Sequence, residues 1–225
     1  MPGNRVLIFD LDGTLIDTMT ELADLFCDML LRECNVPDAI SRHVYIELAG
    51  KGPRPQFEAV LTQHTGEADA AFIDDITARY WVTAESYEPR IFPETLDVLT
   101  GLSRDGHTLI VSSGGHTPSV QRKLHLTGLD GLFGLALGTD LEVPGMAKGP
   151  GHFDFIARSL ALQDGDLQSR GVFVGDAIYD MQVARAAGIV AIGRVTDDNA
   201  ETLRDAGAHH LIHDLTQLEG LLKAL

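Results

Sequence analysis

Two aspartates stand two residues apart directly after a short apolar run, and this spacing could bring two carboxylates to one site. The run is Val6–Phe9, and Asp10-Leu11-Asp12-Gly13-Thr14 follows it. An aspartate at the end of a buried strand is usually paired or metal-bound, because burying a bare charge is costly. Gly13 permits a tight turn at this point. A turn with two capping aspartates is the alternative interpretation.

A second pair of aspartates follows another apolar run. Asp176 and Asp180 come after Val172–Val174, where a helix is expected to begin. Aspartates in such positions often cap a helix and complement its dipole, so this pair alone does not indicate catalysis. Carboxylate oxygens are also the ligands that Mg²⁺ prefers in proteins. Together with the first pair, these residues predict a site for a divalent cation.

Two further segments could bind a phosphate group. Ser112 and Ser113 end a third apolar run and precede two glycines, whose backbone amides can form an anion-binding nest before a helix. Lys148 could add a positive charge from a loop that reaches the same edge. A serine-glycine loop and a surface lysine are the ordinary interpretations of these segments taken singly. Combined with the carboxylates, they form a set suited to phosphoryl transfer.

These groups can meet only if the strands that precede them end at one edge of a sheet. Uninterrupted β-branched runs are typical of parallel strands covered on both faces. Helical patterns alternate with them, which is the doubly wound α/β arrangement. The expected strands are Val6–Phe9, Thr108–Ser112, Val172–Val174, Val190–Ile192 and His210–Ile212. The expected helices are Pro93–Arg104, Pro118–Leu126, Phe153–Ala161, Asp180–Ala187, Ala200–Ala206 and Leu215–Leu222.

The interval between the first two expected strands is far longer than a parallel crossover requires. We therefore expect an α/β core of residues 1–17 and 89–225 and an inserted helical domain of residues 18–88. The insert should cover the carboxyl end of the first strand, with hinges near Leu15–Thr18 and Tyr87–Phe92. Its expected helices are Glu21–Glu33, Ile40–Leu48, Gln56–Gln63 and Ala68–Ala84.

The order of these motifs resembles the haloacid dehalogenase superfamily, within its phosphoglycolate-phosphatase-like and β-phosphoglucomutase-like branch. All four motifs occur in sequence order, and the insert resembles the helical cap of that superfamily. The resemblance implies a Rossmann-like core with a cap domain. It also implies a Mg²⁺-dependent phosphatase that hydrolyses a small phosphorylated metabolite through an aspartyl-phosphate intermediate.

The resemblance also assigns a role to each motif residue. Asp10 would be the nucleophile and Asp12 the general acid and base. The phosphoryl group would be bound by Leu11, Asp12, Ser112, Ser113 and Lys148, of which Ser112 and Lys148 also count as catalytic. Mg²⁺ would be held by Asp10, Asp12, Asp176 and Asp180, the last of these directly or through water.

The chain departs from the pattern of many relatives at two positions. Ser113 stands where many have asparagine, and Gly149 follows the motif lysine where many have proline. The substrate of any one relative therefore cannot be assigned to this protein. Lys51 and Arg54 in the expected cap are candidates to bind substrate, with a solvated basic turn as the alternative. His116, after the second motif, is a further candidate, with a role at the start of the next helix as the alternative.

Other classes of protein share parts of this pattern. Dehalogenases and phosphonate hydrolases of this superfamily lack an acid at the position of Asp12, because their leaving groups need no proton. A sugar phosphomutase shares the core motifs and remains an alternative, as does a non-catalytic sensor of phosphate ligands. An intact nucleophile and acid argue against the sensor.

Composition narrows the class of partner. The 225 residues include 17 Lys and Arg against 33 Asp and Glu, a net charge of −16 that argues against binding nucleic acid or an anionic membrane. Cys27 and Cys34 are expected to be free thiols near one helix face, and His209, His210 and His213 do not form a convincing zinc site. We expect a cytoplasmic monomer or small homo-oligomer whose partner is a small phosphorylated metabolite.

Overall fold

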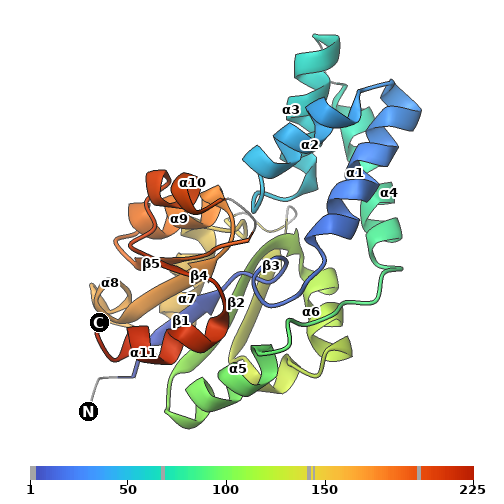
Figure 1. Cartoon of the computed structure of the whole chain (residues 1–225). Coiled ribbons are helices and arrows are strands. Elements are labelled where there is room, and N and C mark those ends of the chain that lie inside the picture. Colours follow the sequence, from blue (N-terminus) through green and yellow to red (C-terminus); the bar gives the residue numbers. More distant parts are fainter. Residues whose placement is uncertain (1–3, 67–68, 141–142, 144, 197–198) are drawn as a thin grey trace.

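A parallel sheet of six strands forms the centre of the protein (Figure 1). The computed structural model describes residues 4–66, 69–140, 143, 145–196 and 199–225. The strand order is β3-β2-β1-β4-β5-β6, which confirms the predicted doubly wound α/β class. The strands are β1 (Val6–Phe9), β2 (Thr108–His116), β3 (Leu135–Thr139), β4 (Gly171–Gly175), β5 (Val190–Arg194) and β6 (His210–Ile212).

The register of the three central strands determines which residues meet at the carboxyl edge. Phe9 of β1 pairs with Val111 of β2 on one side and with Val174 of β4 on the other. The residues that follow these three positions therefore lie side by side at the carboxyl edge, where β2 continues as far as His116. This register explains how motifs more than 100 residues apart in sequence reach one edge.

Helices cover both faces of the sheet, so the central strands are buried on both sides. Leu7 and Phe9 of β1 pack toward one face, and Val6 and Ile8 pack toward the other. Each such side chain contributes about 1.5–3 kcal/mol by leaving water. The first face is covered by α5 (Thr95–Arg104), α6 (Thr117–Leu126) and α11 (Leu218–Leu222). The second is covered by α7 (Pro150–Ser159), α8 (Asp166–Arg170), α9 (Ile178–Ala186) and α10 (Ala200–Asp205).

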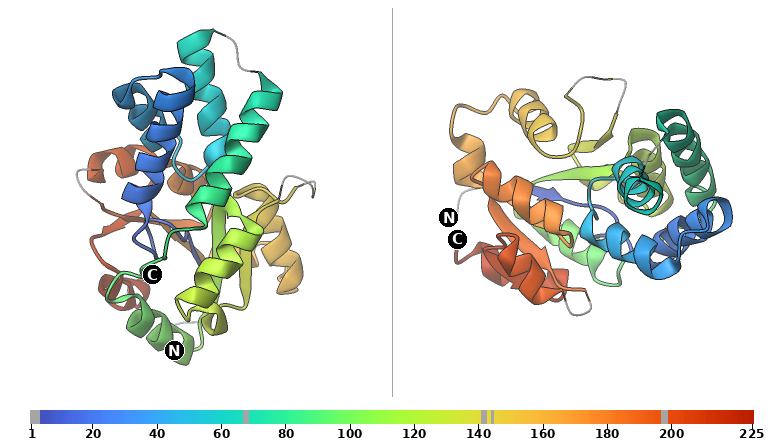
Figure 2. Two further views of the ribbon diagram at one scale, coloured as in Figure 1. Left: turned by 90° about the vertical axis from the view of Figure 1, so that its right-hand side faces the viewer. Right: turned by 90° about the horizontal axis from the view of Figure 1, so that it is seen from above.

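A group of four helices stands beyond the carboxyl ends of the strands (Figures 1 and 2). It has its own apolar core, in which the rings of Phe26 and Phe57 lie 4.5 Å apart and Tyr80 meets Phe57 edge-on. The two chain segments that join this group to the sheet are bonded to each other, since the Asp17 amide donates to the Arg90 carbonyl. The helices are α1 (Met19–Cys34), α2 (Asp38–Glu47), α3 (Pro53–Thr65) and α4 (Ala70–Ala84).

Most expected elements are present, with differences at edges and short segments. Strands β1 and β6 match the expected bounds, whereas β3 and α8 were not expected. The expected start of a helix at Ala68 lies outside the described residues, and α4 begins at Ala70. The expected last helix divides into a 3₁₀ turn, Leu215–Gln217, and α11. The other 3₁₀ turn is Asp130–Leu132.

The two cysteines lie on one helix, as the sequence analysis expected. Cys27 and Cys34 both lie on α1 and are free thiols, and burial raises the pKa of Cys27 to about 11. Within the described ranges, no helix combines the length and apolar character needed to cross a membrane.

Candidate active site

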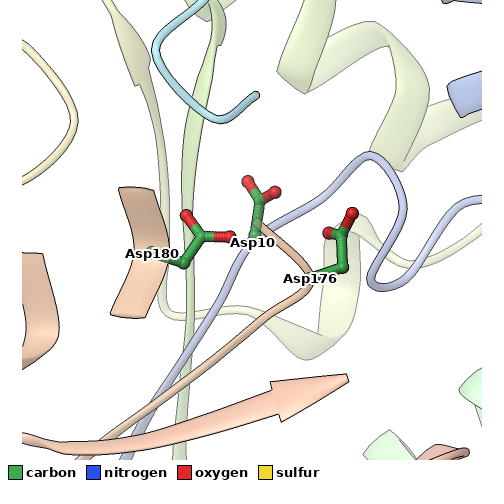
Figure 3. A group of neighbouring side chains, drawn as sticks. All are labelled: Asp10, Asp176 and Asp180. Carbon is green, nitrogen blue, oxygen red and sulfur yellow. The ribbon is translucent and has the colours of Figure 1, made fainter. Parts of the chain in front are cut away.

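Three carboxylates converge at the carboxyl edge of the sheet. Asp10 follows β1, Asp176 follows β4, and Asp180 lies in the first turn of α9. Each offers an oxygen that lies within 4.8 Å of the others, and all three residues are buried. Figure 3 shows the side chains of Asp180 and Asp176 on either side of Asp10. The sequence expectation that these motifs meet is therefore realised in the geometry.

The turn after Asp10 is fitted closely to Asp176. Gly13 has a φ of +81°, and a Cβ atom at this position would collide with the Asp176 carboxylate. Thr14 donates a hydrogen bond of 2.7 Å from its hydroxyl to Asp176 Oδ1. Both contacts require the Gly-Thr pair that ends the first motif, so the motif also positions the second acid.

Arg194, on β5, stabilises the turn that follows β1. Its guanidinium donates to the Thr14 carbonyl at 2.7 Å and pairs with Glu94 at 2.9 Å. The guanidinium also stacks on Phe92, 3.7 Å from the centre of the ring. This buried contact links β5, the turn after β1 and the segment that returns from the helical group. The sequence analysis missed Arg194, because a single arginine after an apolar strand carries no motif.

Lys148 lies between two of the carboxylates. Its Nζ is 2.8 Å from Asp10 Oδ1 and 2.5 Å from Asp180 Oδ1, and its side chain is almost fully buried. Burial opposes the charge, but the neighbouring carboxylates outweigh it and raise the pKa of Lys148. Tyr179 helps to hold the loop by donating its hydroxyl to the Lys148 carbonyl at 3.0 Å. Lys148 is thus a charged ammonium directed at the expected nucleophile.

The single positive charge of Lys148 does not neutralise the three buried carboxylates of the cluster. Burial raises the pKa of Asp10 well above its usual value, and Asp176 and Asp180 add to this effect while Lys148 opposes it. Burial also raises the pKa of Asp176 to about 7, followed in importance by the charge of Asp180. A cation placed among these oxygens would relieve the repulsion.

A second lysine binds Asp12, which lines the same edge but is not one of the three clustered carboxylates. Lys123, on α6, places its Nζ 2.6 Å and 2.8 Å from the two carboxylate oxygens of Asp12. The Thr18 hydroxyl also donates to Oδ1 of Asp12, at 2.5 Å. Lys123 is a buried lysine that the sequence analysis missed, because it lies within an amphipathic helix and outside every motif.

The two serines at the end of β2 point to different places. Ser112 is fully buried, and its Oγ lies 2.8 Å from Nδ1 of His152 on α7. Nε2 of His152 lies 3.2 Å from the Gly138 carbonyl, which can only accept, so Nε2 carries the proton and Nδ1 accepts from Ser112. Burial, together with the charge of Lys148, lowers the pKa of His152 to about 4, so the ring is neutral near pH 7.

Ser113, and not Ser112, lines a cavity with the acids. This acidic cavity has a volume of about 60 Å³ and lies between the sheet edge and the helical group. Its floor includes Asp10, Asp12, Ser113 and Asp176, and its opposite wall includes Tyr45, Gly50, Tyr80 and Trp81. Leu11 is buried in the apolar core, so only its backbone could face a bound phosphate.

A second cavity of about 370 Å³ adjoins the first, and we call it the basic cavity. It brings together the three residues that sequence analysis put forward for substrate binding, Lys51, Arg54 and His116, and Lys148 also lines it. Arg54 already pairs with Asp74 at 2.9 Å and Glu58 at 3.3 Å. The remaining wall includes the rings of Trp81 and Tyr179.

Glycines allow the loop before α3 to touch the end of β2. A Cβ atom at Gly114 would collide with the Gly50 carbonyl, and one at Gly52 would collide with the Gly114 carbonyl. Gly50 and Gly52 belong to the loop before α3, whereas Gly114 belongs to β2. The backbone of the helical group therefore closes directly over the sheet edge at this point.

Comparison with known proteins places this arrangement in a family. Residues 5–188 match the family described as haloacid dehalogenase-like hydrolase. A phosphoglycolate phosphatase of Caulobacter vibrioides is 30% identical over 218 residues, which cover 94% of this chain and 87% of that protein. A phosphoglycolate phosphatase of Haemophilus influenzae is 25% identical, with coverage of 97% and 98%.

Solved structures share the same architecture. A hydrolase from Pseudomonas syringae superposes with a TM-score of 0.79 at 21% identity, covering 99% of both chains. A haloacid dehalogenase-like family protein from Streptococcus pneumoniae gives a TM-score of 0.76 at 20% identity, covering 98% of this chain and 99% of that one. At these identities the likeness shows the fold alone.

The fold is Rossmann-like, and the family match and the relatives place the protein among hydrolases. The chain belongs to the haloacid dehalogenase-like hydrolase family. The expected family and the expected enzyme class, a phosphatase, are thereby confirmed.

Proposed function

We propose that the protein is a Mg²⁺-dependent phosphatase that hydrolyses a small phosphorylated metabolite through an aspartyl-phosphate on Asp10. One observation carries the proposal: the buried Asp10 carboxylate lies 2.8 Å from Lys148 and opens into the acidic cavity that Asp12 and Ser113 also line. A nucleophile, an acid and base, and a phosphate-binding hydroxyl thus share one small space. This is the set that a covalent phosphoryl transfer needs.

In the first half of the reaction the Asp10 carboxylate attacks phosphorus. The bond between phosphorus and the ester oxygen breaks as a bond to Asp10 forms. Asp12, which is ion-paired with Lys123 in the structure and so must take up a proton before this step, gives that proton to the departing oxygen. In the second half the Asp12 carboxylate takes a proton from a water that attacks the phosphoryl group. Phosphate leaves, and both aspartates return to their starting states.

The acid cluster fits a magnesium ion. Burial raises the pKa of Asp10 and of Asp176, and the neighbouring carboxylates raise both further. Hard carboxylate oxygens suit Mg²⁺. We assign the ion to the carboxylates of Asp10 and Asp176 and the backbone carbonyl of Asp12. Asp180 supports the site, since its oxygens already meet Lys148 and the Ala177 amide. When bound, the ion would neutralise phosphoryl charge.

Metal binding can be tested apart from activity. Mg²⁺ at 100 times its dissociation constant should raise the free energy of unfolding by about 2.7 kcal/mol, because only the folded state forms the site. Asp176→Asn should lose most of this increase in a thermal-unfolding experiment. Asp154→Asn, an exposed aspartate on α7, is the matched control and should keep it. An equal rise in all three proteins would argue against this metal site.

The phosphoryl group should be held by Ser113 and Lys148, with the backbone amides of Leu11 and Asp12. This assignment gives Ser113 the role that the sequence analysis gave chiefly to Ser112. Ser113 lines the acidic cavity, whereas the hydroxyl proton of Ser112 is directed to His152. A positively charged lysine beside the nucleophile would offset the charge repulsion between the carboxylate and the phosphate.

The basic cavity is the proposed site for the rest of the substrate. Lys51 and His116 could bind an anionic group there, and Arg54 could contribute despite its pairing with Asp74. The relatives named phosphoglycolate phosphatase make small phosphorylated carboxylic acids the first substrates to test.

We further propose that residues 18–88 act as the cap and that the core comprises 1–17 and 89–225. A cytoplasmic location and a monomer or small homo-oligomer stay predictions.

The test is phosphate release from a panel of phosphorylated acids, sugars and nucleotides, with Mg²⁺ or with EDTA. Release should require Mg²⁺ and disappear in Asp10→Asn. Conversion of a sugar phosphate to its isomer without phosphate release would instead indicate a phosphomutase. Ligand binding without turnover would indicate a sensor.

A further inference from the structure

We propose that Lys123 is a positioning residue for the general acid and base, holding the Asp12 carboxylate where it can reach the leaving oxygen. The inference rests on the function proposed above. Lys123 contacts both oxygens of Asp12, at 2.6 Å and 2.8 Å, so it fixes the rotation of the carboxylate as well as its position. A single hydrogen bond would leave that rotation free.

The surroundings of the pair make this contact durable. The side chains of Lys123 and Asp12 are only 7% and 17% exposed, so solvent competes poorly with the ion pair. Lys123 is buried although lysine is among the residues least often buried, and Asp12 is its ion-pair partner. Its backbone lies on α6, between Val120 and Leu124 of the sheet core. The ammonium is therefore anchored to the rigid part of the molecule.

The second contact to Asp12 comes from a different part of the chain. Thr18 immediately precedes α1, the first helix of the group that covers the site, and its hydroxyl donates to Oδ1. If this group moves when substrate enters, the contact from Thr18 moves with it, whereas the contact from Lys123 stays with the sheet. Lys123 is thus the group that can keep the Asp12 carboxylate in a fixed position relative to Asp10 throughout the reaction cycle.

A test follows from the leaving group. The value of kcat/KM reports only the steps up to release of the alcohol, so it isolates the transfer of the phosphoryl group to Asp10. An alkyl phosphate needs a proton on its leaving oxygen, whereas p-nitrophenyl phosphate does not, because p-nitrophenolate is a stable anion. Lys123→Met should lower kcat/KM for the alkyl phosphate about 10- to 100-fold more than for p-nitrophenyl phosphate. This is less than the roughly 100- to 10,000-fold that a general acid contributes, because Asp12 itself stays in place.

Two comparisons make the outcome decisive. Lys223→Met removes an exposed lysine that pairs with Glu219, and the ratio of the two kcat/KM values should equal that of the wild type. In an Asp12→Asn background, adding Lys123→Met should change neither value further, because Lys123 acts through Asp12. This double variant also removes both buried charges, so it tests the proposal if Lys123→Met alone does not fold.

The failures of the two proposals are distinguishable. If wild-type protein with Mg²⁺ releases phosphate from no member of the panel described above, nor from these two compounds, the proposed function fails. If it hydrolyses both, and Lys123→Met lowers both kcat/KM values equally, Lys123 is a structural residue and this inference is wrong. The inference is also wrong if the double variant loses kcat/KM by the product of the two single-variant losses, since the two residues would then act independently.

Discussion

Ser112 and His152 form a buried hydrogen bond of 2.8 Å that ties β2 to the start of α7. His152 lies four residues after Lys148, and its other ring nitrogen bonds to the Gly138 carbonyl on β3. The pair therefore fastens the loop that carries the lysine to the sheet. The neighbouring Ser113 lines the acidic cavity, and its Oγ accepts a hydrogen bond from the Gly115 amide at 3.0 Å.

The first prediction separates the two serines. Ser113→Ala should lower kcat/KM about 10- to 100-fold, because it removes a hydrogen-bond donor to the phosphoryl oxygens. Ser112→Ala should change kcat/KM less than about threefold but lower the free energy of unfolding by about 1–3 kcal/mol, because it leaves Nδ1 of His152 without its buried donor. Kinetics and urea denaturation of both variants provide the check. The reverse pattern would return the catalytic role to Ser112.

The second prediction concerns the pH dependence of stability. The pKa of His152 is lowered from 6.5 to about 4 in the folded protein, so the unfolded chain binds its proton first as pH falls. Stability should therefore be full above about pH 6.5 and decline as pH falls toward 4, by about 3 kcal/mol in total from this group.

The matched variant for this prediction is His152→Gln, which lacks that titration but keeps every other ionisable group. Urea denaturation at pH 7.5 and pH 4.5 should show a smaller loss of stability in the variant than in the wild type. Identical losses would mean that His152 is not held neutral by burial.

The third prediction concerns the contact between Gly114, at the end of β2, and the loop before α3. Gly114→Ala should lower kcat/KM about 10-fold or more, because the added methyl group collides with the Gly50 carbonyl and displaces the loop over the site. Gly101→Ala is the control, since its Cβ atom would enter open space on α5. It should leave activity unchanged and raise the free energy of unfolding by about 0.5–1 kcal/mol. Similar kinetics for both variants would remove any role for this contact.

The sheet and the positions of its acids could be predicted from the sequence because they rest on local signals. Val6–Phe9 is a continuous apolar run, and the register of parallel neighbours then brings Asp10 and Asp176 together. Strand β3 was missed because it is an edge strand whose Leu135 and Ala136 are only half-buried, so the run is short and mixed.

The supporting residues of the site could not be predicted in the same way. Lys123 and His152 lie on amphipathic helices, where a polar residue at a buried position looks like any residue on the polar face. Their contacts depend on how α6 and α7 pack against the sheet, which no local pattern specifies. The choice between Ser112 and Ser113 likewise depends on which side of β2 each side chain leaves, and a shift of one residue reverses it.

The measurement that tests the central claim most directly is the capture of phosphorylated Asp10. The enzyme is mixed with substrate and Mg²⁺, quenched within one turnover, and treated with borohydride, which reduces an aspartyl-phosphate to homoserine. Peptide mass spectrometry should then find homoserine at position 10 in the wild type and at no position in Asp10→Asn. Phosphate release by the wild type with Asp10 unmodified, together with retained activity in Asp10→Asn, would contradict the mechanism proposed here.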